Sequence, residues 1–394
     1  MSDVELRNLM LLLKDVPHGY LYMLQKIVGT NTSVDWTKGV VRPSMENTWP
    51  LFLSIHLLVI VIGVAASFSM LKDVILLRLY TNSTAIYLLN LLINNLLVLV
   101  VQLPVNFVMM LYENWVFGKA MCYIGAITPY LLVHCAMLTF ILMSVDRYRS
   151  IAHPSKEQIN VFVCLVTIWI SSICVSAPVV AYMHYRDLGH LDKKLRNNGL
   201  CWSTADEYSK VIFVTIFTLP SVAIALILVK TTAELKTKRE LCKLHTRQTE
   251  ECRQKHVSTI IASDADSSTG EDLEENYKER EWVEGEMKTQ RYLTMMIGLW
   301  IICWLPIKIF KTVNTNTMET KDNVFMFDVA PMVLLPISAL STITTPLCFK
   351  LMHRKVVPKC RECEHESHEL PQEFDSRSMN SNDKIAEQFW KQYT

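Results

Sequence analysis

The stretch MCYIGAITPYLLVHCAMLTFILMSVDRYRS, residues 121–150, decides how the rest of the chain must be arranged. Cys122 stands near its beginning and Asp146-Arg147-Tyr148 near its end, and the residues between them are mostly apolar. The twenty-five positions from Cys122 to Arg147 span about 37 Å as an α-helix, slightly more than the ~30 Å hydrocarbon core of a bilayer. The stretch therefore predicts a membrane-crossing helix with a cysteine at one face and an arginine beside an acid at the other.

Six further stretches of the 394-residue chain are long and apolar enough to cross a bilayer. Several exceed 18 residues with almost no charge, which argues against buried helices of a large soluble protein. The predicted fold is an all-α membrane protein, a seven-transmembrane helix bundle. We expect the spans at residues 50–77, 85–111, 121–149, 160–182, 208–230, 287–311 and 324–349.

Basic residues indicate which ends of these spans face the cytoplasm, because cytoplasmic ends carry an excess of Lys and Arg. They lie at the ends of the third, fifth and seventh spans or just after them, at Arg147, Arg149, Lys156, Lys236, Lys238, Arg239, Lys243, Lys350, Arg354 and Lys355. We therefore expect an extracellular N-terminal segment at residues 1–49, a cytoplasmic C-terminus and a multi-pass protein of the plasma membrane. The first span, rather than a cleaved signal peptide, is expected to direct insertion.

Three segments outside the spans have a different composition. The basic segment 350–357 is expected to lie along the membrane as a short amphipathic eighth helix, so that bundle and helix together occupy residues 50–358. The connection 231–286 is long and polar and is expected to be a flexible cytoplasmic loop. Residues 359–394 are expected to be a flexible cytoplasmic tail.

The cysteines and one sequon suggest covalent modifications. Of eleven cysteines, only Cys122 and Cys201 fall in segments expected outside, where an oxidising environment favours a disulfide between them. Asn31 begins an Asn-Thr-Ser sequon on the same side and could carry a glycan. Cys360 and Cys363 follow the basic segment and are candidate palmitoylation sites, with ordinary reduced thiols as the alternative.

Short motifs occur in order on the expected spans. They are Trp115-Val-Phe-Gly118 ahead of Cys122, Ser144-Val-Asp146-Arg147-Tyr148, Trp169, Pro178, Phe217, Pro220, Cys303-Trp304-Leu-Pro306 and Thr345-Pro346-Leu-Cys-Phe349. Together they resemble the rhodopsin-like (class A) G-protein-coupled receptors over about residues 50–357. The resemblance implies a receptor, not an enzyme, that binds an extracellular ligand and activates a heterotrimeric G protein. Arrestin and receptor kinases would be further partners, and no cofactor or nucleic acid is implied.

The resemblance also implies which residues switch the receptor on. They are Asp146, Arg147, Tyr148, Glu286, Trp304, Pro306, Thr345, Pro346 and Phe349. Glu286 lies twenty residues before Pro306, about 30 Å along the sixth helix, which places it level with Arg147. An ion pair there would hold the third and sixth helices together at rest; the alternative is a solvated Glu286. Trp304 would act at a proline hinge, with simple packing as the alternative.

The chain departs from the family pattern at positions that matter. Asn95 stands where the second helix of the family carries Asp, so no charge would offset the dehydration of a sodium ion, and we expect no metal site. Leu228 and Phe349 replace tyrosines whose hydroxyls stabilise the active arrangement. One alternative is therefore a receptor-like protein without efficient G-protein coupling, acting as a decoy or as a partner of another receptor. Another is a membrane transporter, although the spans offer few charges besides Lys308.

The candidate ligand pocket lies in the outer half of the bundle. Its members are Gln102, Asn106, Thr128, Trp304, Lys308 and Lys311. Lys308 lies one turn outside Trp304, where an ammonium group is costly unless an anion accompanies it. Pro129 stands where amine-binding members carry Asp, so we expect a peptide or another anion-bearing molecule rather than a monoamine. The alternative is that both lysines extend to the membrane surface.

Overall fold

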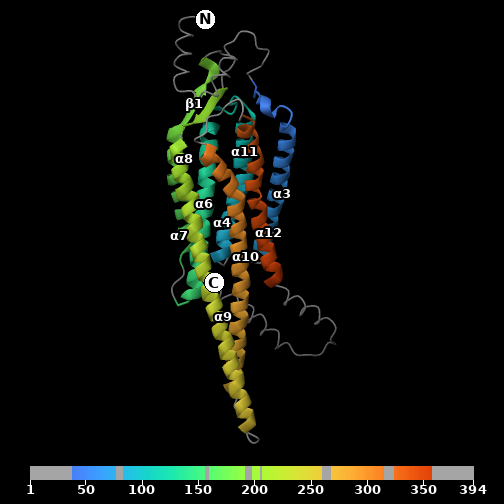
Figure 1. Ribbon diagram of the computed structural model, residues 1–394, viewed down its shortest axis with the longest axis vertical. Helices are drawn as coiled ribbons and strands as arrows, with labels where there is room; N and C mark the ends of the chain where they lie inside the picture. The colour runs from blue at the N-terminus through green and yellow to red at the C-terminus, as the bar shows by residue number, and fades with distance from the viewer. Residues whose placement is uncertain are drawn as a thin grey trace.

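The computed structural model describes residues 38–76, 83–155, 159–190, 198–204, 206–259, 268–314 and 324–356. Within these ranges seven helices are long and apolar enough to cross a membrane, at Trp49–Leu76, Ser83–Leu111, Gly118–Ala152, Val161–Tyr182, Lys210–Gln248, Tyr277–Asn314 and Met326–Met352. They run side by side as one bundle (Figure 1). The predicted all-α, seven-transmembrane fold is confirmed.

The first, third and fourth spans each consist of one main helix. They are α3 (Trp49–Leu76), α6 (Gly118–Ala152) and α7 (Val161–Ser176), which continues as a 3₁₀ turn, η4 (Ala177–Tyr182). The Asn160 side chain caps α7 by accepting hydrogen bonds from the backbone N–H groups of Phe162 and Val163. Pro178 stands at the start of the 3₁₀ turn, where it cannot continue the backbone ladder of α7.

Two spans contain a π-helical segment that their sequences did not reveal. The second span consists of α4 (Ser83–Leu97), η3 (Val98–Gln102) and α5 (Leu103–Leu111). The fifth consists of α8 (Asp206–Ile212), η7 (Phe213–Thr218) and α9 (Leu219–Thr259). Each π-helical segment immediately precedes a proline-containing turn, Leu103-Pro104 or Leu219-Pro220, where the proline lacks the N–H of an ordinary helix.

The sixth and seventh spans are α10 (Ser268–Asn314), and α11 (Val324–Ala339) followed by α12 (Ser341–Val356). The break between α11 and α12 falls at Leu340, whose N–H still reaches the carbonyl of Pro336 at 3.1 Å. The short C-terminal helix expected at residues 350–357 is present as the last turns of α12. Asn31, Cys360, Cys363 and the tail 359–394 lie outside the described residues.

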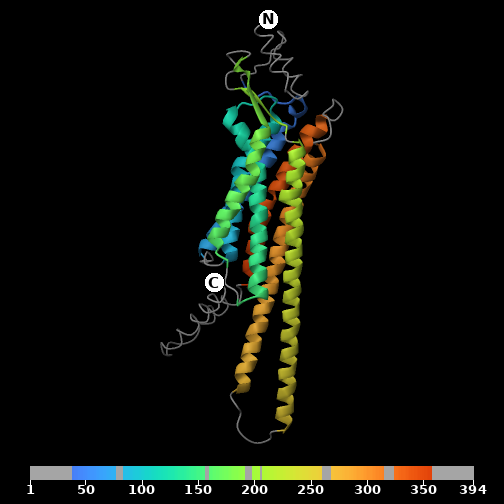
Figure 2. The ribbon, with the colours of Figure 1, turned by 90° about the vertical axis from the view of Figure 1, so that its left-hand side faces the viewer.

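The connection between the fifth and sixth spans differs from our expectation of an unstructured loop. Helix α9 continues to Thr259 and α10 already begins at Ser268, so the two helices project beyond the others as an antiparallel pair (Figure 2). We call this pair the stalk. The segment is polar, but it is rich in Glu, Lys and Arg, which are strong helix formers. Leu235 and Cys242 of α9 and Val283 of α10 are buried.

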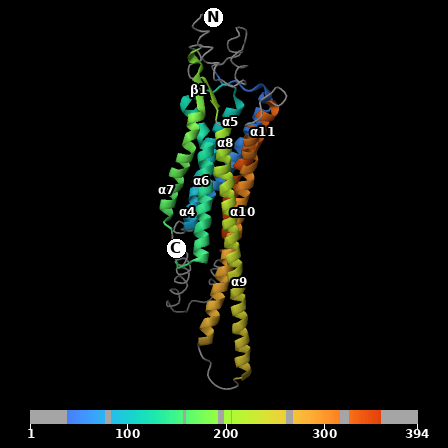
Figure 3. The same ribbon diagram turned by 60° about the vertical axis from the view of Figure 1, so that its left-hand side comes forward.

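At the opposite end of the bundle, strand β1 (Met183–Asp187) pairs with β2 (Gly199–Ser203) as an antiparallel hairpin (Figure 3). Backbone bridges join β2 to Trp115 through Gly199, and Tyr112 to Val41 near the start of the described chain. Short 3₁₀ turns lie at Pro43–Met45 (η1) and Leu188–His190 (η5). We refer below to the hairpin end and the stalk end of the bundle.

The distribution of apolar side chains suits a bundle in lipid. Large apolar residues such as Leu58 and Val229 are exposed on the outside of the bundle. The interior holds the largest buried side chains, among them Trp300, Phe140 and Tyr87. Apolar exposure of this extent is unfavourable in water but not against acyl chains.

Candidate functional site

An ion pair joins α6 to α10 at the stalk end. Arg147 Nη2 lies 2.5 Å from Glu286 Oε2, and the two residues are only 9% and 5% exposed. The predicted pairing of these two residues is therefore present. Removing either partner of a buried ion pair is strongly unfavourable, because it leaves the other as an uncompensated charge.

The neighbours of Arg147 in the Asp-Arg-Tyr motif have different surroundings. Asp146 is half-buried. The Tyr148 ring meets the His153 ring edge to face, with centroids 6.4 Å apart, where α6 has just ended. Arg147 is the member of the motif that forms an ion pair with another helix.

A column of aromatic rings lies in the middle of the bundle. The Trp300 ring stacks on Trp304 at 5.5 Å, meets Phe140 of α6 at 5.4 Å and lies 6.4 Å from Phe217 of η7. Trp304 Nε1 donates a 3.0 Å hydrogen bond to the hydroxyl of Ser341, the first residue of α12. Trp304 therefore links α10 to the point where the seventh span breaks, so a movement of its ring would affect both helices.

Three further switch residues lie along these two helices. Pro306 lies inside α10 and Pro346 inside α12. The Thr345 hydroxyl is buried and donates to the Ser341 carbonyl at 2.9 Å, within its own helix. Ser341 therefore receives hydrogen bonds from both Trp304 and Thr345.

Lys308 faces aromatic rings on the hairpin side of Trp304. Its Nζ lies 5.6 Å from the centroid of the Tyr130 ring and 5.7 Å from that of Trp304. Among the described residues no carboxylate lies within 4.0 Å of this nitrogen. Each ring face attracts a cation by about 0.5–2 kcal/mol, which offsets only part of the cost of removing an ammonium group from water. The site can accept an anion.

Among the described residues, the other expected pocket residues form no hydrogen bond with Lys308. Gln102 and Asn106 are buried, and in the described part of the chain neither side chain is hydrogen-bonded to Lys308. The Thr128 hydroxyl donates to the carbonyl of Ile124 in its own helix. Lys311 is exposed, as expected for a side chain that extends to the membrane surface.

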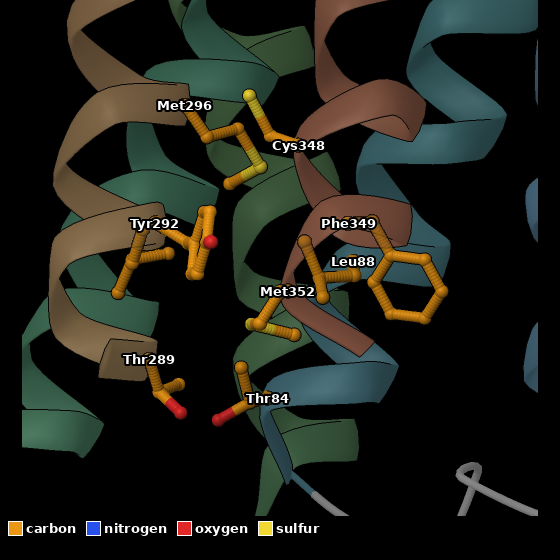
Figure 4. A pocket seen from close by; sticks show the side chains of 9 residues that line it. Thr84, Leu88, Thr289, Tyr292, Met296, Cys348, Phe349 and Met352 are labelled. Carbon is orange, nitrogen blue, oxygen red and sulfur yellow. The ribbon is translucent and has the colours of Figure 1, made fainter. Parts of the chain in front are cut away.

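Phe349 lies at the stalk end, where it helps to line a small open pocket (Figure 4). The pocket is bounded by α4, α10 and α12, at Thr84, Leu88, Thr289, Tyr292, Leu293, Met296, Cys348, Phe349 and Met352. The lining is almost entirely apolar. Phe349 brings no hydroxyl group to this end of α12.

The hairpin end carries the disulfide. Cys122, in the first turns of α6, is bonded to Cys201 in the middle of β2, as predicted. Cys201 pairs with Tyr185 across the hairpin. The disulfide therefore fixes the whole hairpin over the hairpin end of α6.

Several contacts were not anticipated from the sequence. Tyr130 lies two turns beyond Cys122 on α6, and the sequence around it does not indicate that its ring faces Lys308. Arg42 Nη1 lies 2.6 Å from Asp328 Oδ1, and Ser44 donates to the other oxygen of the same carboxylate. Both contacts join residues far apart in sequence, and their only sequence signal is an ionisable residue within or next to a span.

Comparison with known proteins agrees with this arrangement. The family model described as "7 transmembrane receptor (rhodopsin family)" matches residues 74–349. Neuropeptide FF receptor 2 of Mus musculus is 26% identical over 185 residues, which cover 43% of this chain and 44% of the relative. Tachykinin-like peptides receptor 86C of Drosophila melanogaster is 26% identical over 239 residues, which cover 58% and 41%.

This chain therefore spans less than half the length of each of these relatives. The family and the relatives are receptors and not enzymes. Because the family model matches more than half of the chain and the helices form the expected bundle, the chain belongs to the rhodopsin family of seven-transmembrane receptors.

Proposed function

We propose that this receptor binds an extracellular peptide, or another anion-bearing molecule, and activates a heterotrimeric G protein at the plasma membrane. The hairpin end and the N-terminus face outside, and the stalk end faces the cytoplasm. The many basic residues at the stalk end support this orientation, as does the disulfide at the hairpin end. The names of the two relatives, a neuropeptide receptor and a tachykinin-like peptide receptor, support a peptide.

The observation that carries the ligand class is the environment of Lys308. Its ammonium group lies between two ring faces, with no carboxylate within 4.0 Å among the described residues. A carboxylate of the ligand would complete the site. A charge-assisted hydrogen bond of this kind contributes about 1.5–3 kcal/mol, which corresponds to about ten- to a hundred-fold in affinity.

Contacts between α10 and the seventh span link this site toward the stalk end, the side proposed to be cytoplasmic. Lys308 contacts Trp304, and Trp304 is hydrogen-bonded to Ser341. A ligand that shifts the Trp304 ring would change the α10–α12 contact, and α10 also carries Glu286. Separation of Glu286 from Arg147 would then open the stalk end to the G protein, and arrestin and receptor kinases would recognise the same open state.

A screen with paired ligands tests the proposal. Cells expressing the receptor are exposed to synthetic peptides, each made as a C-terminal free acid and as an amide, with G-protein dissociation as the readout. For an active acid, Lys308→Gln should weaken the response by about ten- to a hundred-fold, and amidation should cost a similar factor. The two losses should not add, because each removes the same contact. Lys311→Gln, at an exposed lysine three residues away, is the matched control.

Fully independent losses in that cycle would mean that Lys308 is not the counter-ion of the ligand.

A second candidate function is supported by Leu228 and Phe349, which are buried and lack the hydroxyl groups expected of the family. A receptor of this kind would bind a peptide without efficient coupling. This second function would be favoured if a peptide binds the receptor saturably but causes no G-protein dissociation, in cells where a control receptor couples.

A further inference from the structure

Lys238 lies where three helices meet at the base of the stalk. It belongs to α9, and its Nζ donates a 2.7 Å hydrogen bond to the backbone carbonyl of Ile151 on α6. The same nitrogen lies 5.5 Å from the centroid of the Trp282 ring on α10. One ammonium group therefore holds both α6 and α10.

The Ile151 carbonyl is an unusually good acceptor for a cation. Helix α6 ends at Ala152, and the last carbonyls of a helix have no partner within it. In a continuing helix this carbonyl would accept from the N–H of Ser155, which lies beyond the end of α6, and Pro154, one residue nearer, has no N–H. The negative end of the helix dipole adds to the attraction for a positive charge.

A second contact reinforces the first. Arg239, which follows Lys238 on α9, pairs with Glu284 of α10 at 2.7 Å. Both side chains keep more than a third of their exposure, so this pair is the weaker contact. Trp282 and Glu284 lie within one helical turn of Glu286 and so move with it.

We propose that Lys238 and Arg239 form a second restraint on the outward movement of α10, separate from the Arg147–Glu286 pair. This inference rests on the proposed function, because it concerns the same opening of the stalk end. When α10 moves away from α6, Lys238 can follow only one of its two partners. It must either release the Ile151 carbonyl or lose the Trp282 ring. Arg239 opposes the same movement by holding Glu284 to α9.

The two restraints differ in chemistry. Arg147–Glu286 is a buried ion pair between two side chains. Lys238 instead combines a backbone carbonyl with an aromatic ring, and neither partner titrates. We call the two contacts of Lys238 the clasp. The clasp acts independently of the protonation state of Glu286. Losing the clasp and losing the ion pair should therefore multiply the ratio of open to closed receptor by independent factors.

The test measures the position of α10 directly and needs no G protein. Full-length receptor in lipid nanodiscs carries a keto amino acid at each of two exposed positions, Ser150 of α6 and Lys288 of α10. Spin labels are attached to the keto groups, so the native cysteines need not be replaced. Pulsed electron paramagnetic resonance measures the distance between the labels and gives the ratio of the population with the long distance (open) to that with the short distance (closed). The variants are Lys238→Met, Lys238→Arg, Arg239→Gln and Trp282→Leu, each also on a Glu286→Gln background, where the open form is more populated.

We expect Lys238→Met to raise the open-to-closed ratio by about tenfold. Arg239→Gln and Trp282→Leu should each raise it by about two- to fivefold. Lys238→Arg keeps the charge and the hydrogen-bond donor, so most of the receptor should stay in the closed form. Lys236→Met, at an exposed lysine two positions earlier on α9, is the matched control and should change nothing.

Parent-like ratios for Lys238→Met in both backgrounds would overturn the clasp, whatever Glu286→Gln does. An increase that Lys238→Arg reproduces in full would also overturn it, because the effect would then not depend on charge. If the ratios shift as expected but no G protein responds to the open form, the clasp stands and the proposed coupling fails. If Lys238→Met does not yield folded protein, Trp282→Leu and Arg239→Gln decide the matter.

Discussion

The two ends of the bundle are held by different kinds of contact. At the hairpin end the backbone joins the segments: Arg42 N–H donates to Leu111 O at 3.0 Å, Glu113 N–H to Val40 O at 2.8 Å, and Trp115 and Gly199 exchange two bonds of 2.8 Å. The disulfide and the Arg42–Asp328 pair add to these. At the stalk end the contacts between α6, α9 and α10 described above come from side chains, at Arg147, Lys238 and Arg239.

This difference has a mechanical consequence. Backbone pairing and a disulfide can be undone only by separating whole segments, whereas a side-chain contact breaks when one side chain changes rotamer. The hairpin end should therefore keep its shape while the stalk end opens. A receptor of this construction would hold its ligand in a fixed frame and report binding through movement at the far end.

The largest effect is expected from the disulfide. Cys122→Ala removes the covalent tie between α6 and β2, and loss of a native disulfide typically costs about 2–5 kcal/mol. Surface expression should fall sharply, measured by antibody labelling of intact cells. Cys174→Ala, at an exposed free cysteine of α7, is the control and should express like the parent. Parent-level expression and thermal stability of Cys122→Ala would show that the backbone pairing alone holds this end.

A smaller effect is expected from the ion pair at the same end. Asp328→Asn should lower the free energy of unfolding by about 1–2 kcal/mol, less than for a fully buried pair, because the Arg42 side chain keeps 27% of its exposure. Thermal unfolding of the purified protein measures it. Arg42→Gln should cost a similar amount, and the double variant little more. Additive losses would mean that each residue stabilises the end through other partners. Basal signalling should stay at the parent level in all three.

The smallest effect is expected between the two ends. Asn95 and Ser67 are buried in the middle of the bundle, and Asn95 carries no charge to hold a cation. Replacing choline by sodium at constant ionic strength should therefore leave the midpoint of thermal unfolding unchanged. Asn95→Asp should create a dependence on sodium in the same assay. A rise of several degrees with sodium in the parent would show that neutral oxygens assemble a cation site.

The sequence predicted the parts of the molecule that depend on regular geometry. Arg147 and Glu286 were paired because a helix has a fixed rise, so positions counted from Cys122 and from Pro306 reach the same level. The contacts of Lys308 and Lys238 were not predicted, because they depend on which way a side chain points after the helices pack. The π-helical segments at Val98–Gln102 and Phe213–Thr218 rotate those helices further.

The stalk escaped prediction for a different reason. Its polar composition was interpreted as a solvated loop, although the same Glu, Lys and Arg residues favour helix. The stripe that joins the two helices contains few apolar side chains, among them Leu235, Cys242 and Val283, and so gives only a weak periodic signal.

The most direct test of this account is nucleotide exchange on purified heterotrimeric G proteins, catalysed by the receptor in nanodiscs without ligand. Breaking the buried Arg147–Glu286 pair should open the stalk end, so Glu286→Gln should accelerate exchange on at least one G-protein class by about tenfold over the parent. Adding Arg147→Ala should abolish the acceleration. The proposed coupling would be contradicted if spin-label distances show the open form but Glu286→Gln exchanges nucleotide at the parent rate on every G-protein class.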